Sequence, residues 1–276
     1  MNVPARERVF GYLVLGIGAL LALYPFFSIL MLALTPAKER QPGQLIPPSF
    51  SFENFAQAWE RGGFGSALWS SVVVAVGVVA GALLVSILAG YAFAVLRFPG
   101  KPLIMAVLLV GLIVPYEGII VPLYFLLDGM GLLNTYWALI LPQIATSVPL
   151  GVLWMRTAYG NVPASLRDAA SIDGASKWRT LWQVYVPISQ SGIATLGTLL
   201  FLYTWNEFLM ALVLVPQNPA VQTAPLALSF FAGSTRNFDP GVTAAAAVIV
   251  ALPILIVYVF FQRRFISGIA AGAVKE

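Results

Sequence analysis

Long apolar runs separated by short polar stretches dominate this chain. Each of six runs has about 20 residues or more, and a helix of that length crosses the hydrocarbon core of a bilayer at a rise of about 1.5 Å per residue. The runs are continuous and do not alternate, which favours helices over the strands of a membrane β-barrel. The pattern predicts an all-α integral membrane protein formed by one domain, 1–276. We expect spans over about 9–34, 66–94, 103–127, 136–155, 188–215 and 242–261.

The first run and the polar stretch behind it allow alternative interpretations. A cleaved signal peptide has an apolar core of about 7 to 15 residues, and the run at 9–34 is longer, so we expect a retained first span. The following stretch, 35–65, is polar and rich in proline. Its segment Phe52–Trp59 could form a short interfacial helix, but we favour a plain loop with aromatic anchors.

Composition agrees with a membrane protein and excludes several kinds of chemistry. Of the 276 residues 59% are hydrophobic and 9% are charged, with a mean hydropathy of +0.88, whereas a soluble domain carries about 25% charged residues. The chain has no Cys and no His, which excludes disulfides, thiol chemistry, HExxH zinc hydrolysis and a Ser-His pair. It also has no G-x-x-x-x-G-K-[ST] motif, so ATP would have to be bound by another subunit. We expect no catalytic residue, no metal site and no cofactor on this chain.

The basic residues lie between the apolar runs and predict the topology. With six spans, eleven of the fifteen Lys and Arg residues fall on one side and four on the other. Since loops rich in Lys and Arg remain in the cytoplasm, we expect both termini there, together with the stretch 161–187. The majority side holds Arg6, Arg8, Arg97, Lys101, Arg156, Arg167, Lys177, Arg179, Arg263, Arg264 and Lys275, and the other holds Lys38, Arg40, Arg61 and Arg236.

The stretch 161–187 is the longest polar interruption in the second half of the chain and has the sequence features of helices. Asn161 can cap a helix and Pro163 is tolerated in a first turn. Gly174 then breaks the pattern, and Pro187 marks its end. Between them Trp178, Leu181, Trp182 and Tyr185 recur at i, i+3, i+4 and i+7, which predicts one apolar face. We therefore expect two short helices joined at Gly174, outside the bilayer.

This stretch resembles the EAA loop of ABC importer permeases. The family pattern has Glu-Ala-Ala, a Gly six positions after the Glu and a Pro thirteen positions after that Gly. Here Asp168, Gly174 and Pro187 keep both spacings, with Asp168 in place of Glu. Three further stretches resemble the carbohydrate branch of the family: Gly131–Tyr136 (GLLNTY), Trp205–Phe208 (WNEF) and the tail Gln262–Lys275, with QRRF at its start and AGAVK at its end.

The resemblance implies a type I ABC importer permease fold in the cytoplasmic membrane. The implied partners are a homologous permease, two nucleotide-binding ATPase subunits that hold ATP and Mg, and an extracytoplasmic solute-binding protein. The substrate would be a sugar, most simply a di- or oligosaccharide. In the family, the EAA loop sits in a groove of the ATPase and transmits its closure to the spans. The residues implied for this coupling are Arg167, Asp168, Ala169, Ala170, Asp173, Gly174, Ala175 and Lys177.

Two acids, Glu117 and Glu207, lie within predicted spans. A charge at the centre of a span costs about 2.5–3.5 kcal/mol on insertion scales, so it usually faces a bundle interior or a wet cavity. With Trp205 and Asn206 they are candidates for a substrate pathway, because carboxylates and amides bind sugar hydroxyls and Trp stacks on a sugar ring. The alternative is a buried polar contact between helices.

Prolines and glycines inside the spans predict local irregularity and close packing. Prolines free backbone carbonyl groups, which a membrane tolerates only where another group satisfies them, and they suggest broken helices around a cavity. Gly77 and Gly81 form a G-x-x-x-G pair, which we interpret as a helix-packing contact. The prolines are Pro115, Pro122, Pro142 and Pro149.

Two other functions remain open at this stage. An importer of the same architecture could carry a polyol or a glycerol-phosphate, although a phosphate would favour Lys or Arg inside a span, and none is present. A stand-alone ion-coupled secondary transporter would need no ATPase and would leave the EAA-like loop without a role.

Overall fold

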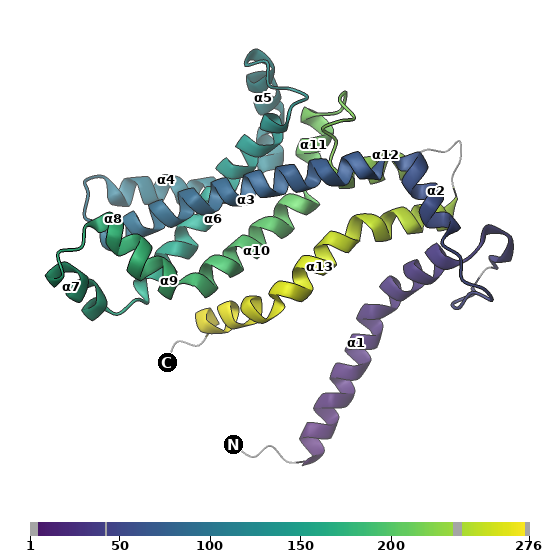
Figure 1. Cartoon of the computed structure of the whole chain (residues 1–276), viewed down its shortest axis with the longest axis horizontal. Helices are drawn as coiled ribbons and strands as arrows, with labels where there is room; N and C mark the ends of the chain where they lie inside the picture. Colours follow the sequence, from purple (N-terminus) through teal and green to yellow (C-terminus); the bar gives the residue numbers. More distant parts are fainter. Residues whose placement is uncertain (1–4, 42, 234–238, 274–276) are drawn as a thin grey trace. The chain divides into compact units, whose positions relative to one another are not determined.

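A computed structural model describes residues 5–41, 43–233 and 239–273, and within these ranges every regular element is helical. The chain divides into two compact units: Met1–Gly65 with Ala227–Leu252, and Ser66–Leu226 with Pro253–Glu276. Figure 1 shows the helices in the colours of the sequence. The bounds are α1 (Ala5–Leu34), η1 (Ala37–Glu39), α2 (Glu53–Gly62), α3 (Phe64–Val95), α4 (Lys101–Ile113), α5 (Tyr116–Gly129), α6 (Tyr136–Gly160), α7 (Ala164–Ile172), α8 (Lys177–Thr180), η2 (Leu181–Tyr185), α9 (Val186–Ile188), α10 (Gln190–Asn206), α11 (Leu209–Leu214), α12 (Ala224–Gly233) and α13 (Pro240–Ala273).

The described residues contain four to six candidate membrane spans. Four single helices, α1, α3, α6 and α13, are long and apolar enough to cross a bilayer. Two further helix pairs pass the same test only together, because each pair is sharply bent. The all-helical fold class is confirmed, and the expected six spans fit the described residues if each bent pair counts as one span.

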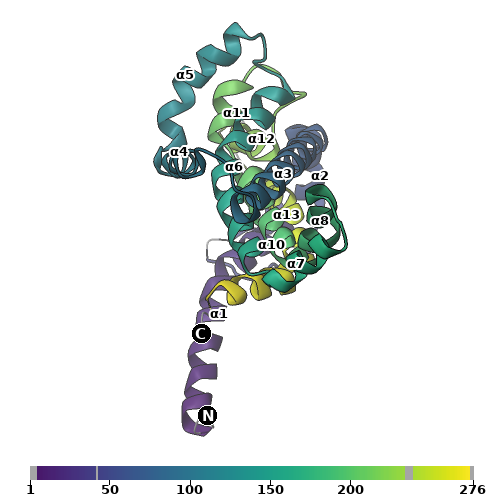
Figure 2. The same cartoon turned by 90° about the vertical axis from the view of Figure 1, so that its left-hand side faces the viewer.

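The predicted span 103–127 is broken, as the prolines within the spans suggested. It consists of α4 and α5, which meet at an angle of 100°, and Figures 1 and 2 both show α5 rising steeply away from α4. Pro115 lies at the break in an extended conformation, with φ −67° and ψ 124°. Since proline donates no backbone hydrogen bond, the helix ends there. Pro122, Pro142 and Pro149, by contrast, lie inside continuous helices.

The predicted span 188–215 is interrupted as well. Lys177–Ile188 and Gln190–Asn206 meet at 78°, and α10 then ends at Asn206, before α11 starts at Leu209. The intervening Glu207 is extended, with φ −65° and ψ 126°. Both interrupted spans therefore carry their acid at or next to the break, Glu117 in the first turn of α5 and Glu207 before α11.

The first unit is held together by a polar cluster around Arg40. The Arg40 guanidinium pairs with Asp239 and donates to Asn54 Oδ1 at 2.9 Å. Asn54, in α2, in turn donates to the carbonyl oxygens of Ala33 and Thr35, which lie at the end of α1. From the sequence, Arg40 was expected only to contribute to the membrane topology. The plain loop favoured for Phe52–Trp59 is wrong, because Glu53–Gly62 is helical.

Asp239 also caps the start of α13. One of its carboxylate oxygens, Oδ1, accepts from the backbone N–H groups of Gly241 and Val242. Partial burial opposes ionisation of the carboxyl group, but the hydrogen bonds from Val242 and Gly241 and the Arg40 guanidinium outweigh it and lower the pKa of Asp239.

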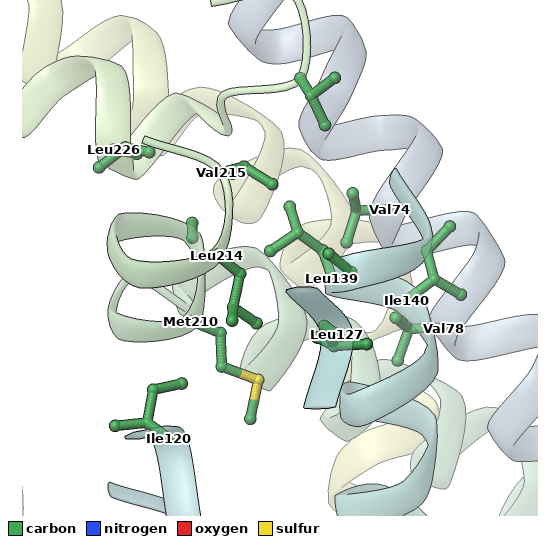
Figure 3. Close-up of a cluster of buried hydrophobic side chains, with 13 residues drawn as sticks. Val74, Val78, Ile120, Leu127, Leu139, Ile140, Met210, Leu214, Val215 and Leu226 are labelled. Atoms are coloured by element: carbon green, nitrogen blue, oxygen red, sulfur yellow. The ribbon is translucent and has the colours of Figure 1, made fainter. Parts of the chain in front are cut away.

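The second unit contains two clusters of buried apolar side chains. The first joins α3, α5, α6, α11 and α12, and Figure 3 shows Ile120, Leu139 and Met210 among its members. The second joins α3, α6, α10 and η2. Lipid is as apolar as these side chains, so their packing is secured by close approach and not by exclusion of water.

Glycines permit the approach of α3 to α6. A Cβ added to Gly77 or Gly81 would meet Ile140 or Ile144 of α6, as expected for a packing pair. The closest backbone approach is at Gly90, where a Cβ would lie 2.4 Å from Met155 Cβ and 3.1 Å from the backbone N of Arg156. The α3–α6 contact therefore extends over most of both helices.

Candidate functional site

The loop at 161–187 begins where α6 ends, at Gly160, five residues beyond the predicted end of that span. Asn161 terminates α6 and does not cap the next helix; that expectation was wrong. Pro163 instead occupies the N-cap position of α7, with φ −55° and ψ 134°, and no side chain caps it. Figure 1 shows α7, α8 and α9 together at one end of this unit, away from α5 and α11.

Gly174 closes α7 with a Schellman turn. The N–H of Ala175 donates to the carbonyl oxygen of Ala170 at 2.9 Å, and the N–H of Gly174 donates to that of Ser171 at 3.2 Å. Gly174 itself has φ +68°, a conformation that costs a residue with a Cβ about 1–2 kcal/mol. The expected break at Gly174 thus has a definite geometry, which fixes the direction in which the chain leaves α7.

The second half of the loop is a short helix that widens into a π turn. Ser176 Oγ accepts from the N–H of Arg179 at 3.2 Å and caps α8, and η2 follows as a π-helical turn, Leu181–Tyr185. The single apolar face expected here is wrong. Leu181 and Tyr185 are buried, whereas Trp178 and Trp182 are 62% and 37% exposed.

Three tyrosines connect this loop to the membrane helices. Tyr91 of α3, Tyr159 of α6 and Tyr185 of η2 are all buried and pack edge to face, with ring centroids 5.1–6.3 Å apart. Such aromatic pairs contribute about 0.5–1.5 kcal/mol beyond the area they bury. The buried side of the loop is therefore fixed to α3 and α6. Nothing in the sequence pattern identified this cluster, since its members are 68 and 26 residues apart along the chain.

The candidate coupling residues lie mostly on the outer surface of the loop. Ala170 is buried and Ala175 is half-buried, and the other six are exposed: Arg167, Asp168, Ala169, Asp173, Gly174 and Lys177. Arg167 forms an ion pair with the adjacent Asp168 at 3.2 Å, with both side chains about half exposed, which contributes little to stability.

Sequence reasoning missed two apolar residues on the same surface. Ile172, the last residue of α7, is 86% exposed, and Leu166 is 42% exposed. An isolated Ile directly before Asp173 and Gly174 was the available signal. The exposed surface of α7 thus combines charged, small and apolar side chains.

The second group of candidates lies at the two helix breaks. Both oxygens of the Glu207 carboxylate accept backbone hydrogen bonds, from Met210 at 2.8 Å and from Ala211 at 3.2 Å. Glu207 is half-buried and caps α11. Glu117 is exposed in the first turn of α5.

Trp205 and Asn206 differ in their surroundings. Trp205 is 2% exposed and packs against Phe201, with ring centroids 5.4 Å apart, so its ring face is covered by this chain. Asn206 is exposed and donates to the carbonyl oxygen of Leu202 at 2.8 Å. The structure therefore places Glu117 and Glu207 at two helix breaks, leaves Asn206 accessible and places Trp205 in the core.

A separate apolar groove of about 440 Å³ lies beside the loop and not beside the acids. It runs between the second half of α6 and the start of α10, with Trp154 donating to the carbonyl oxygen of Gly192 at 2.9 Å in its wall. The groove therefore does not coincide with the two helix breaks.

Residues 82–270 match the family of binding-protein-dependent transport system inner membrane components. The chain belongs to this family. The resemblance inferred from the four motifs is thereby confirmed. The chain is a multi-pass inner-membrane permease of an ABC transporter, and such subunits are not catalytic.

Similar permeases match over almost their whole length. The chain is 34% identical to the trehalose transport system permease protein SugB of Mycobacterium tuberculosis over 92% of this chain and 93% of that one. It is 34% identical to the diacetylchitobiose uptake system permease protein NgcG of Streptomyces coelicolor, over 93% of this chain and 87% of that one. It is 31% identical to the lactose transport system permease protein LacG of Rhizobium radiobacter, over 100% of both.

A solved structure shares the fold of the permease. A chain of a bacterial ABC transporter that imports the acidic polysaccharide alginate matches with a TM-score of 0.78 and 22% identity, over 96% of this chain and 99% of that one. At this identity the likeness concerns the arrangement of helices. Broken helices are therefore compatible with a permease of this fold.

Proposed function

We propose that this permease imports a neutral di- or oligosaccharide, driven by ATP that partner subunits bind and hydrolyse with Mg. The permeases named above for trehalose, diacetylchitobiose and lactose support a sugar substrate. Its partners would be a second permease, two ATPase subunits and an extracytoplasmic solute-binding protein. The chain itself would bind no nucleotide and would act as one transmembrane domain with both termini and the 161–187 loop in the cytoplasm, as the distribution of Lys and Arg favours.

In this proposal α7 is the contact with the ATPase. The observation that carries it is the exposure of the α7 surface, with Ile172 86% exposed at the end of a helix that the Gly174 turn holds in place. Asp168, on the EAA spacing, lies in the middle of the same helix, and Asp173 follows its last residue. Burying one Ile side chain contributes about 1.5–3 kcal/mol, which makes Ile172 the strongest single contributor that the surface offers. Lys177 lies beyond the turn, beside Trp178, and is not included in this surface.

The substrate pathway would pass the two helix breaks. Glu117 and Asn206 are exposed within predicted spans, where a polar side chain is stable only against water, a partner subunit or a substrate. Glu207 and Tyr116 would form the wall behind them. Residues 103–155 and 188–215 contain no Lys or Arg, so a phosphate group would find no cation here. This favours a neutral sugar over a glycerol-phosphate, and leaves a polyol as the second candidate.

The test is ATP-dependent uptake by the permease reconstituted with its partner subunits and its solute-binding protein. Radiolabelled trehalose, lactose, glycerol and glycerol-phosphate would each be offered with and without ATP. Uptake of a disaccharide that requires ATP supports the proposal. If only glycerol or glycerol-phosphate is taken up, the substrate is a polyol or a glycerol-phosphate and not a sugar. Uptake that follows an ion gradient without ATP would refute the proposal.

A further inference from the structure

Trp178 and Trp182 form an exposed aromatic pair on α8 and η2. Their rings are 5.7 Å apart and nearly edge to face, and they are 62% and 37% exposed. The opposite side of the same segment packs in the chain's own core, where Leu181 is 2% exposed and Tyr185 is 3% exposed. The tryptophans therefore present a large apolar surface that this chain leaves uncovered.

Two basic residues accompany the pair in the sequence. Lys177 and Arg179 flank Trp178 and are both exposed, and Arg179 is oriented by a hydrogen bond of 2.7 Å to the side-chain oxygen of Gln183. From Gly174 to Asn206 the sequence has no Asp or Glu. The preceding helix, α7, is different, because Asp168 carries its acid beside Arg167 and Asp173 follows. The two halves of the loop thus have different charge.

The tryptophan pair lies where the chain is expected to enter the membrane. α8 leads through η2 and α9 into α10, and Lys177–Ile188 qualifies with Gln190–Asn206 as one bent candidate span. In the same unit, Trp69 and Trp137 are 65% and 56% exposed near the starts of α3 and α6. From Trp137 to the end of α6 the helix rises about 35 Å, slightly more than a hydrocarbon core. Tryptophan is enriched at both membrane interfaces, so the loop beyond α6 begins at the interface opposite Trp137.

We propose that Trp178, Trp182, Lys177 and Arg179 bind the headgroup layer of anionic phospholipids. The rings would lie at the level of the lipid glycerol groups, and the two cations would contact lipid phosphates. The 161–187 loop would then contact two different surfaces, with the lipid bilayer under α8 and η2 and a protein on α7. The Gly174 turn separates them. This arrangement would keep the base of the loop at a fixed depth while α7 moves.

The test uses the absence of cysteine from the chain, which permits single nitroxide labels. Gln183→Cys places a label beside Trp182, and Ile172→Cys places one on the exposed end of α7. Each variant is assembled with its partner permease in vesicles of phosphatidylethanolamine and phosphatidylglycerol, with and without the ATPase subunits. Accessibility to oxygen and to a water-soluble nickel chelate then gives the depth of each label.

We expect the Gln183→Cys label to lie at headgroup depth both with and without the ATPase, and the Ile172→Cys label to be exposed to water until the ATPase binds. A Gln183→Cys label as accessible to nickel as the other, or one protected only by the ATPase, would overturn the lipid proposal. Failure of the ATPase to protect Ile172→Cys would instead count against the proposed function and leave the lipid contact standing.

A charge test separates lipid binding from simple aromatic packing. Replacing phosphatidylglycerol with phosphatidylcholine should move the Gln183→Cys label outward, and Arg179→Gln should produce the same shift in the anionic vesicles. Arg167→Gln is the matched control, because Arg167 is an exposed cation on α7, and it should leave the label's depth unchanged. A depth that is insensitive to both lipid charge and Arg179→Gln would overturn the assignment of the cations to lipid phosphates.

Discussion

The backbone N–H of Ala175 donates to the carbonyl oxygen of Ala170 at 2.9 Å, across a glycine with φ +68°. This bond closes α7 and determines how the loop's two helices are oriented. A Cβ added to Gly174 would meet no atom within 4 Å. The requirement for glycine is therefore one of backbone conformation and not of space.

Gly174→Ala should weaken coupling without unfolding the permease. A residue with a Cβ pays about 1–2 kcal/mol in this conformation, so we expect the turn to rearrange and substrate-stimulated ATP hydrolysis to fall several-fold in the reconstituted complex. The matched control is Gly160→Ala, because Gly160 also has open space around it and is not in the left-handed conformation. Equal losses in both variants would show that the turn geometry is not what matters.

The two acids at the helix breaks should respond differently to substitution. Glu207→Ala removes the acceptors for Met210 and Ala211 and should lower the unfolding temperature, since loss of a cap costs about 0.5–2 kcal/mol. Glu117→Gln should leave the unfolding temperature unchanged, because Glu117 is exposed, but should raise the KM for sugar uptake. Thermal unfolding in detergent and uptake kinetics measure the two effects. A Glu117→Gln variant with wild-type KM would remove Glu117 from the pathway.

Asp239 makes the first unit sensitive to acid. Its pKa is lower in the folded chain, so its contribution to stability is complete above the ordinary carboxyl pKa of about 3.9 and is lost as the pH falls through the folded value. Asp239→Asn keeps a capping oxygen but loses the charge opposite Arg40, and should cost about 1 kcal/mol at neutral pH, since the Asp239 side chain is still 30% exposed.

Unfolding temperatures of wild type and Asp239→Asn should therefore differ at pH 7 and converge below about pH 4. Asp239→Ala, which also removes the cap, should be less stable than Asp239→Asn both at pH 7 and below about pH 4. A difference between wild type and Asp239→Asn that does not change with pH would contradict the role of the charge.

Gly90→Ala should disrupt the contact between α3 and α6. The added Cβ would lie 2.4 Å from Met155 Cβ and 3.1 Å from backbone atoms of α6, and overpacking of this kind costs about 1–3 kcal/mol. Gly81→Ala is the control, since its Cβ would meet only Ile144 side-chain carbons, the nearest being the terminal Cδ1, which can move. We expect a clear loss of thermal stability for Gly90→Ala and a smaller one for Gly81→Ala. The reverse order would place the critical contact elsewhere.

Several features of the protein could be predicted from local patterns alone. Continuous apolar runs have to become helices in a membrane, because lipid cannot satisfy free backbone groups, and the structure contains α1, α3, α6 and α13 where such runs occur. The spacing of Asp168, Gly174 and Pro187, together with three further motifs, indicated the family, and Gly174 was expected to separate two helices. These conclusions depend on residues close together in the sequence.

Tertiary structure decided the rest. Four prolines lay inside predicted spans, but of these only Pro115 ends its helix, and Glu207 became a cap because α11 starts beside it. The division of Trp178 and Trp182 from Leu181 and Tyr185 depends on the packing of Tyr185 against Tyr91 and Tyr159. The contact of Arg40 with Asp239 joins residues 199 positions apart. The periodicity of the sequence specifies which residues can share a helix face, but contacts between distant segments determine which face is buried.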